Sequence, residues 1–401
     1  MRRCLTDQAA GVRSSRIDLA GAAIVRGRRA RRRRQAFALA SVIGATVLAT
    51  GVVLQDWPGT GDGAGPAAGV IIEPVPTDPS LDQLDPPPRL AGRPGLPAEL
   101  AVDLVGGGAA GGLVLAASDG RTLELGPVRD VISAHRVAGG WALVSGHPGT
   151  TRLWWVGQDD HRPVSLLAGM DSIVMERARV AWRRGAMLST ATLSGEGALQ
   201  DRVDTTAPAG DGHPVGFAGP TVLLARVEPA GWDTWRPDRG GYTQAWTGRV
   251  LRVYGGAPDG AAAVGLVPPG AGADGPCLAR LDPERRLAPT DRSCPPGGLS
   301  ADGPAALSPH GRWLITTAAG AGGPVLVDVG DVRAGQPVPV IAVPELASLV
   351  GRPVWVDPEQ ALLPGPDRLV RVVPERLFAG DPAGVEVVPL PGGQALVVES
   401  L

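Results

Sequence analysis

Beyond about residue 100, the apolar residues of this 401-residue chain fall in short or alternating runs, each bounded by Gly, Pro or an Asp-Gly pair. This pattern is typical of strands and turns, because successive side chains of a strand point to opposite faces and these residues favour tight turns. The clearest runs lie at 113–117, 122–125, 141–145, 151–156, 180–182, 187–193, 221–227, 250–254, 324–329 and 369–373. Stretches with a helical period are few and short, so we predict an all-β domain over residues 100–401.

The strand runs recur at a regular interval. One central strand per unit falls near residues 114, 142, 188, 223, 264, 314 and 362, a mean spacing of about 41 residues, which matches propeller blades of four strands. The last run, Ala395–Glu399, is an isolated strand, whereas the first unit, Gly112–Pro127, has room for only two or three strands. We expect these two fragments to complete one blade, because that closure removes exposed sheet edges. The sequence therefore predicts a β-propeller of about seven blades, with six blades as the nearest alternative and a pair of β-sandwiches as the other.

One segment carries a family resemblance. Residues 305–315, Ala-Ala-Leu-Ser-Pro-His-Gly-Arg-Trp-Leu-Ile, resemble the Ser-Pro-Asp-Gly-Arg turn and following strand of WD-repeat and Tol-type propeller blades, with His310 where Asp is usual. Weaker matches lie at 256–260 and 299–303. The resemblance implies a propeller and carries over no catalytic residue.

A long apolar segment precedes the predicted domain. Residues 36–54 contain no charged side chain over 19 positions, close to the roughly 20 residues with which a helix crosses a bilayer. The arginine-rich tract 26–34 lies directly before this segment, and Trp57 follows it as an expected interface anchor. Because arginine-rich flanks stay in the cytoplasm, we predict a single-pass protein of the cell membrane. Residues 1–35 would form a cytoplasmic tail, residues 36–54 a transmembrane helix, and the C-terminal part would be extracytoplasmic.

A cleaved signal peptide is the alternative interpretation of the apolar segment. Val47-Leu48-Ala49 resembles a small-residue cleavage site, and residues 33–37 loosely resemble a twin-arginine motif. We favour an uncleaved anchor, because the segment before the apolar run is long for a signal peptide and cleavage after Ala49 would divide that run. The arginine tract is interpreted as a topology determinant at the lipid headgroups.

Residues 55–99 are rich in Pro and Gly and include Pro86-Pro87-Pro88. Proline stiffens a chain toward an extended conformation, so we predict a linker that spaces the β domain from the membrane. The arrangement of arginine tract, single anchor, proline-rich linker and propeller-like domain resembles that of uncharacterised exported proteins of high-GC Gram-positive bacteria. That resemblance implies a surface-displayed binding or scaffold domain.

Charge is segregated along the chain. The formal net charge is −2, but 11 of the 38 basic residues, all arginines, precede position 36, and the remainder of the chain holds 27 basic and 38 acidic residues. Phosphate contacts need a basic surface. The sequence therefore argues against nucleic acid as a partner of the β domain.

Two of the three cysteines fall in the predicted extracytoplasmic domain. Cys277 and Cys294 flank a segment whose midpoint follows Pro283, so a hairpin would bring them opposite one another. We predict a disulfide between them, because exported proteins face an oxidising compartment. Cys4 lies in the predicted cytoplasmic tail and is expected to stay reduced.

No motif for catalysis, metal or cofactor binding is present. The five histidines show no zinc-site spacing, and there is no Gly-x-Ser-x-Gly elbow or phosphate-binding loop. Asp159-Asp160-His161 is a local acid and imidazole cluster that would suit proton transfer or calcium. We favour a hairpin cap there, because the cluster directly follows a predicted strand.

Aromatic side chains gather in one part of the chain. Trp232, Trp235, Tyr242 and Trp246 fall within 15 residues. As an exposed loop they would offer flat apolar faces to a sugar or peptide, whereas in a hairpin they would pack between blades. Both interpretations stay open, and packing is the favoured one. For Trp154-Trp155 we expect one ring inside and one outside.

Three functions remain at this stage. We favour a membrane-tethered binding or scaffold module without catalysis, whose partner is a protein or glycan of the cell envelope. The alternative is an exported hydrolase or lyase with its active site at the mouth of the propeller channel, where several blades contribute residues. A regulatory role of the short tail ranks last, because 35 residues are too few for an independent domain.

Overall fold

The computed structural model describes residues 102–107, 112–160, 162–207, 212–270, 272–273, 275–295, 297–319, 323–333, 336–343, 352–365, 368–390 and 395–400. Contacts divide the chain into two units, Met1–Gln83 and Leu84–Leu401, and every described residue belongs to the second. The predicted tail (1–35), transmembrane helix (36–54) and linker (55–99) lie outside the described residues. Among the residues that are described, none of the helices combines the length and the apolar character needed to cross a bilayer.

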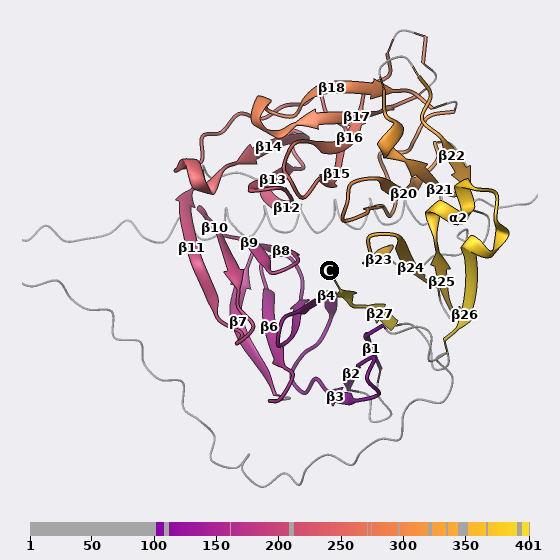
Figure 1. Cartoon of the computed structure of the whole chain (residues 1–401). Coiled ribbons are helices and arrows are strands. Elements are labelled where there is room, and N and C mark those ends of the chain that lie inside the picture. The colour runs from indigo at the N-terminus through magenta and orange to yellow at the C-terminus, as the bar shows by residue number, and fades with distance from the viewer. Residues whose placement is uncertain are drawn as a thin grey trace, which may run out of the picture. The chain divides into compact units, whose positions relative to one another are not determined.

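The described strands form seven sheets, which we number as blades 1 to 7 (Figure 1). Blade 1 contains β1 (Leu104–Gly107), β2 (Leu113–Ala116), β3 (Thr122–Glu124) and β27 (Ala395–Val397). Blade 2 contains β4 (Val131–Val137), β5 (Gly140–Ser145), β6 (Thr151–Gly157), β7 (Pro163–Met170) and β28 (Glu399–Ser400). Blade 3 contains β8 (Ser172–Glu176), β9 (Arg179–Arg184), β10 (Met187–Leu193) and β11 (Leu199–Thr206). Blade 4 contains β12 (His213–Ala218), β13 (Thr221–Arg226) and β14 (Gly231–Trp235). Blade 5 contains β15 (Arg252–Gly256), β16 (Ala263–Val267), β17 (Cys277–Asp282) and β18 (Ala288–Ser293). Blade 6 contains β19 (Ala306–Leu307), β20 (Trp313–Thr317), β21 (Pro324–Asp328) and β22 (Val340–Ala342). Blade 7 contains β23 (Val354–Asp357), β24 (Gln360–Pro364), β25 (Arg368–Val372) and β26 (Val385–Pro389).

Helices in the described part are short. They are α2 (Pro374–Phe378) and the 3-10 turns η2 (Pro237–Arg239), η3 (Pro283–Arg285), η4 (Val329–Asp331) and η6 (Pro382–Gly384). The prediction of an all-β fold is therefore confirmed for the described residues. The seven predicted central strands fall in seven different sheets, which also confirms the count of seven blades.

The end of the chain closes the ring. β27 pairs antiparallel with β1, with Leu104 opposite Val397, so the first and last fragments complete blade 1 as predicted. The sequence did not indicate the next step, in which β28 pairs in parallel with β4 of blade 2. The final strands thus join two neighbouring blades, and no edge of the inner strands β1 and β4 is left unpaired at this position.

Seven clusters of buried apolar side chains lie between successive blades. β5 shows the principle: Trp141 and Leu143 pack toward blade 1, whereas Ala142 and Val144 pack toward blade 3. Because each blade is covered on both faces, its central strands are apolar on both faces, and β5 is buried along its whole length. One cluster joins blade 7 to blade 1, so the core, too, forms a closed ring.

The same arrangement corrects the expectation for Trp154-Trp155. The two rings do point to opposite faces of β6, but both are buried, at 6% and 7% exposure. Trp154 packs in the cluster with blade 1 and Trp155 in the cluster with blade 3. In a propeller blade neither face of a central strand is solvent-facing.

The predicted disulfide is present. Cys277 and Cys294 are bonded to each other at the two ends of the β17–β18 hairpin, which turns through η3. The Asp282 side chain caps this turn by accepting hydrogen bonds from the backbone N–H groups of Glu284 and Arg285. The sulfur bridge therefore closes the outer hairpin of blade 5.

Candidate functional site

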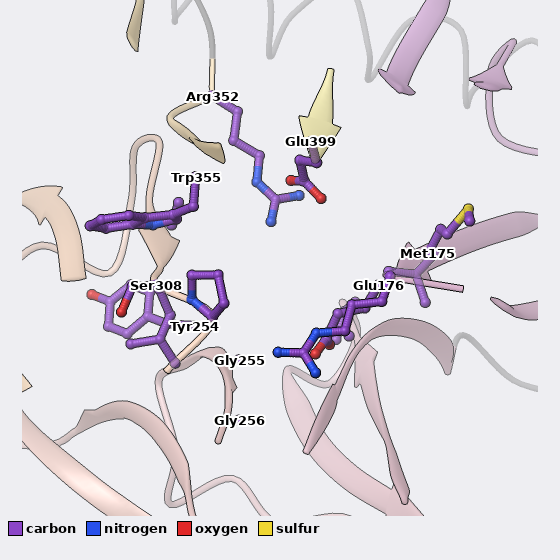
Figure 2. A pocket seen from close by; sticks show the side chains of 16 residues that line it. Met175, Glu176, Tyr254, Gly255, Gly256, Ser308, Arg352, Trp355 and Glu399 are labelled. Carbon is purple, nitrogen blue, oxygen red and sulfur yellow. The ribbon is translucent and has the colours of Figure 1, made fainter. Parts of the chain in front are cut away.

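A cavity lies where the inner strands of several blades meet (Figure 2). It is lined from β8, β12, β15, β19, β23 and β28, and it contains about 710 Å³ of non-protein space, counting the part open to solvent. Gly216, Gly255 and Gly256 form part of its wall. A Cβ on Gly256 would overlap Ala218 of the neighbouring blade. Glycine here lets β12 and β15 approach closely and keeps side chains out of the channel.

One charged group of the cavity comes from the tight turn between β8 and β9. Arg177 occupies this turn with φ 56° and is exposed. The preceding residue, Glu176, lies 3.6 Å from Arg179 in an ion pair. Burial raises the pKa of the Glu176 carboxyl above its ordinary value, although the charges of Arg179 and Arg177 oppose that shift. The Glu176 carboxyl therefore holds a proton more readily than an ordinary glutamate side chain.

A second charged group comes from the closing strand. β28 places Glu399 beside β4, where its Oε2 lies 3.0 Å from Nδ1 of the buried His135. Nε2 of the same ring lies 3.0 Å from Ser133 Oγ. Burial opposes ionisation of Glu399, but His135 and then Arg352 more than offset it, so the pKa of Glu399 lies below its ordinary value. Figure 2 shows Arg352 extending into the cavity beside Glu399.

Aromatic and hydroxyl groups form the opposite wall. Trp355 is buried, and its indole Nε1 has no hydrogen-bond partner among the described residues. The hydroxyl of Tyr254 accepts a hydrogen bond from Thr316 Oγ1 at 3.1 Å, and burial raises the pKa of this phenol. Ser308, from the predicted WD-like turn, accepts a hydrogen bond from the backbone N–H of Trp313 at 2.9 Å. Tyr254 and Ser308 are thus held in place, whereas the Trp355 donor is free.

The aromatic residues that the sequence singled out lie elsewhere, in and beyond β14 of blade 4. Trp235 is 2% exposed, and its Nε1 donates to the Gly240 carbonyl at 3.2 Å. The Tyr242 hydroxyl donates to Asp233 at 2.7 Å, and burial raises the pKa of that hydroxyl. Trp232 and Trp246 are half-buried. Ligand binding by these four residues stays a prediction, but none of them lines the central cavity.

This aromatic segment covers an edge that a fourth strand would occupy. Blade 4 has three strands among the described residues, and Trp232 exchanges two backbone hydrogen bonds with Thr247, at 3.0 and 2.8 Å. Arg226 lies over the Trp246 ring, 4.8 Å from its centroid. The packing interpretation therefore has a structural purpose: the segment shields the outer edge of β14.

The acidic cluster at 159–161 lies in the loop after β6. Asp160 accepts a hydrogen bond from the Arg162 backbone N–H at 3.3 Å, which is the capping role favoured above, and His161 lies outside the described residues. In the described part of the chain, no three His, Cys, Asp or Glu residues are grouped so that they could hold a metal ion.

Sequence reasoning missed the channel residues Glu176, Arg177, Arg352 and Glu399. They come from three separate places in the chain, Glu176-Arg177, Arg352 and Glu399, so they form no local motif. One usable signal was the closing strand itself, since a strand that ends at the ring centre must place its side chains near the channel.

Comparisons with known proteins add little beyond this geometry. No protein-family model matches the sequence, and no curated protein does either. Similar solved structures include a functionally unknown protein from Desulfotomaculum acetoxidans, with 11% identity, TM-score 0.45, and coverage of 75% of this chain and 99% of that one. Apo AztD from Citrobacter koseri is 11% identical with a TM-score of 0.43, and the match covers 74% of this chain and 96% of that one. Kluyveromyces lactis Hsv2 is 10% identical with a TM-score of 0.43, and the match covers 68% of this chain and 89% of that one. The fold assignment rests on the strand pairing described above, and no function is taken from these proteins.

Proposed function

We propose that this protein is a membrane-tethered, extracytoplasmic binding or scaffold module, and that the central channel of its propeller holds the ligand. The partner is a component of the cell envelope, a protein or a glycan. The observation that carries the proposal is the open cavity at the ring centre, into which separate blades contribute charged and aromatic side chains. Such convergent polar groups in a concave site are typical of ligand binding.

The placement outside the membrane is supported by two features of the chain. The uncharged segment 36–54 follows an arginine tract, which favours a cytoplasmic N-terminus. The Cys277–Cys294 disulfide fits an oxidising compartment, because cytosolic thiols are kept reduced.

Binding is favoured over catalysis by the state of the channel carboxylates. Glu176 is paired with Arg179, and Glu399 is paired with His135, so neither is a free base. The second candidate, an exported hydrolase or lyase, draws support from the raised pKa of Glu176, which would suit a proton donor. Turnover that is lost in Glu176→Gln would favour this second candidate.

A steric block tests the proposed binding site. Gly216 lines the cavity, and the atom nearest to a Cβ placed there is 3.9 Å away, so Gly216→Phe should fill the channel and leave the blades intact. Gly323 has open space around it, so Gly323→Phe is the matched control. We expect immobilised full-length protein in detergent to retain soluble cell-envelope fragments, and Gly216→Phe alone to lose them. Equal retention by both variants would remove the channel from the proposal.

A further inference from the structure

Three hydrogen-bond donors at the central cavity have no partner among the described residues. The guanidinium groups of Arg177 and Arg352 make no ion pair or hydrogen bond there, and the buried Trp355 Nε1–H has no acceptor. All three residues line the same cavity. Buried polar groups in folded proteins are nearly always paired, so the Trp355 N–H needs an explanation. Arg177 and Arg352 are exposed side chains that line the same cavity.

The neighbouring acceptors are already engaged. Glu176 lies 3.6 Å from Arg179, and Glu399 lies 3.0 Å from His135. Counting Arg179, the charged side chains at this place are three arginines and two glutamates, so one positive charge remains in surplus. A cleft with surplus charge of one sign attracts ligands of the other sign.

The two arginines reach the cavity from well-separated parts of the ring. Arg177 belongs to blade 3, and Arg352 lies two residues before the start of β23 of blade 7. Blades 4, 5 and 6 separate them in one direction and blades 1 and 2 in the other, so they approach the cavity from roughly opposite sides. Guanidinium groups match the planar oxygens of carboxylates and the oxygens of phosphates.

We propose that the channel binds an oxyanion, a carboxylate or phosphate group of a small ligand, which Arg177 and Arg352 hold from opposite sides and to which Trp355 Nε1 donates. This inference rests on the proposed function in one respect, since it takes the channel to be the ligand site. It adds the charge and the hydrogen-bonding character of the ligand. A neutral or cationic ligand would leave the three donors unpaired.

Two anions, one cation and four variants test the inference. Full-length protein in detergent is titrated by calorimetry with citrate, with inorganic phosphate, and with spermidine as a cationic comparison. We expect saturable binding of at least one anion with a Kd between about 1 μM and 1 mM. Arg177→Gln and Arg352→Gln should each weaken it by about tenfold or more, since each removes a charged hydrogen bond. The exposed Arg249, whose side chain lies outside the cavity, gives the control Arg249→Gln, which should bind normally.

Trp355→Phe gives a readout that a structural role would not produce. It keeps an aromatic ring but removes the N–H, so the anion affinity of the folded variant should fall. The smaller ring should lower the melting temperature without ligand, because Trp355 is buried between blades 6 and 7, and that loss of stability alone does not change the affinity of the folded protein for an anion. Citrate binding without phosphate binding identifies a carboxylate ligand, and the reverse identifies a phosphate. Absence of binding for both anions, or binding that the two arginine variants leave unchanged, overturns the inference. The proposed function survives that result if Gly216→Phe still abolishes retention of envelope fragments, so the two failures are distinguishable.

Discussion

The disulfide of blade 5 allows a quantitative prediction. Cys277 and Cys294 are 17 residues apart, and closing a loop of that size removes enough entropy from the unfolded chain to stabilise the fold by about 3 kcal/mol. Cys277 is fully buried in the core between blades 4 and 5, so alanine is a better replacement than serine, which would bury an unpaired hydroxyl. Unfolding entropy grows with chain length, and for a domain of about 300 residues this loss corresponds to a decrease in melting temperature of about 5 °C.

Two measurements check this prediction. Alkylation of denatured, unreduced protein followed by mass spectrometry should label Cys4 alone, whereas prior reduction should expose all three cysteines. Differential scanning calorimetry should show the lower melting temperature for the Cys277→Ala/Cys294→Ala variant, and added reductant should lower that of the wild type but not that of the variant. Labelling of three cysteines without reduction, or a wild-type melting temperature that reductant does not change, would refute the reasoning.

Two further predictions concern buried carboxylates. Asp103 accepts hydrogen bonds from Trp141 Nε1 at 2.6 Å, from the Ser118 backbone N–H at 2.6 Å and from Arg136 at 3.0 Å. Asp103→Ala should therefore lower the free energy of unfolding, measured with urea, by about 3 kcal/mol, whereas the exposed control Asp119→Ala should lower it by less than about 1 kcal/mol. Equal losses in the two variants would contradict a special role for Asp103. For Glu399, whose pKa is lowered in the fold from an ordinary 4.5, the stabilisation should be complete above about pH 4.5 and be lost as the pH falls through the folded-state pKa. Glu399→Gln should remove that part of the acid sensitivity, and an identical pH profile of unfolding for variant and wild type would show that the His135 pair contributes nothing.

Much of the fold could be predicted because blade strands carry strong local signals. β16 and β24 are short apolar runs bounded by turn residues, and the isolated run at the C-terminus indicates ring closure from the sequence alone. The second pairing of that end, β28 with β4, could not be predicted, because a pairing of two residues adds no recognisable pattern. The expectation that one ring of Trp154-Trp155 is solvent-exposed was wrong for a related reason: alternation tells which face a side chain occupies but not what covers that face.

The candidate site was harder to predict, for a geometric reason. Residues from six of the seven blades line the cavity. Arg177 and Arg352 are therefore far apart in sequence and look like ordinary surface arginines. The aromatic residues at Trp232–Trp246 suggested a ligand site because they are close together in sequence. In the structure this segment covers the outer edge of β14, which accounts for their spacing. The donors without a partner differ from the paired ones by their surroundings alone, and the sequence does not record those surroundings.

The central claim, a propeller displayed outside the membrane, is tested most directly by thiol labelling in intact cells. A cysteine introduced by Arg249→Cys would sit on the exposed surface of the propeller, and Cys4 in the predicted cytoplasmic tail serves as the internal reference. With a membrane-impermeant maleimide, the account predicts that the new cysteine is labelled in intact cells and that Cys4 is labelled only after lysis. Labelling of both positions only after lysis would contradict it.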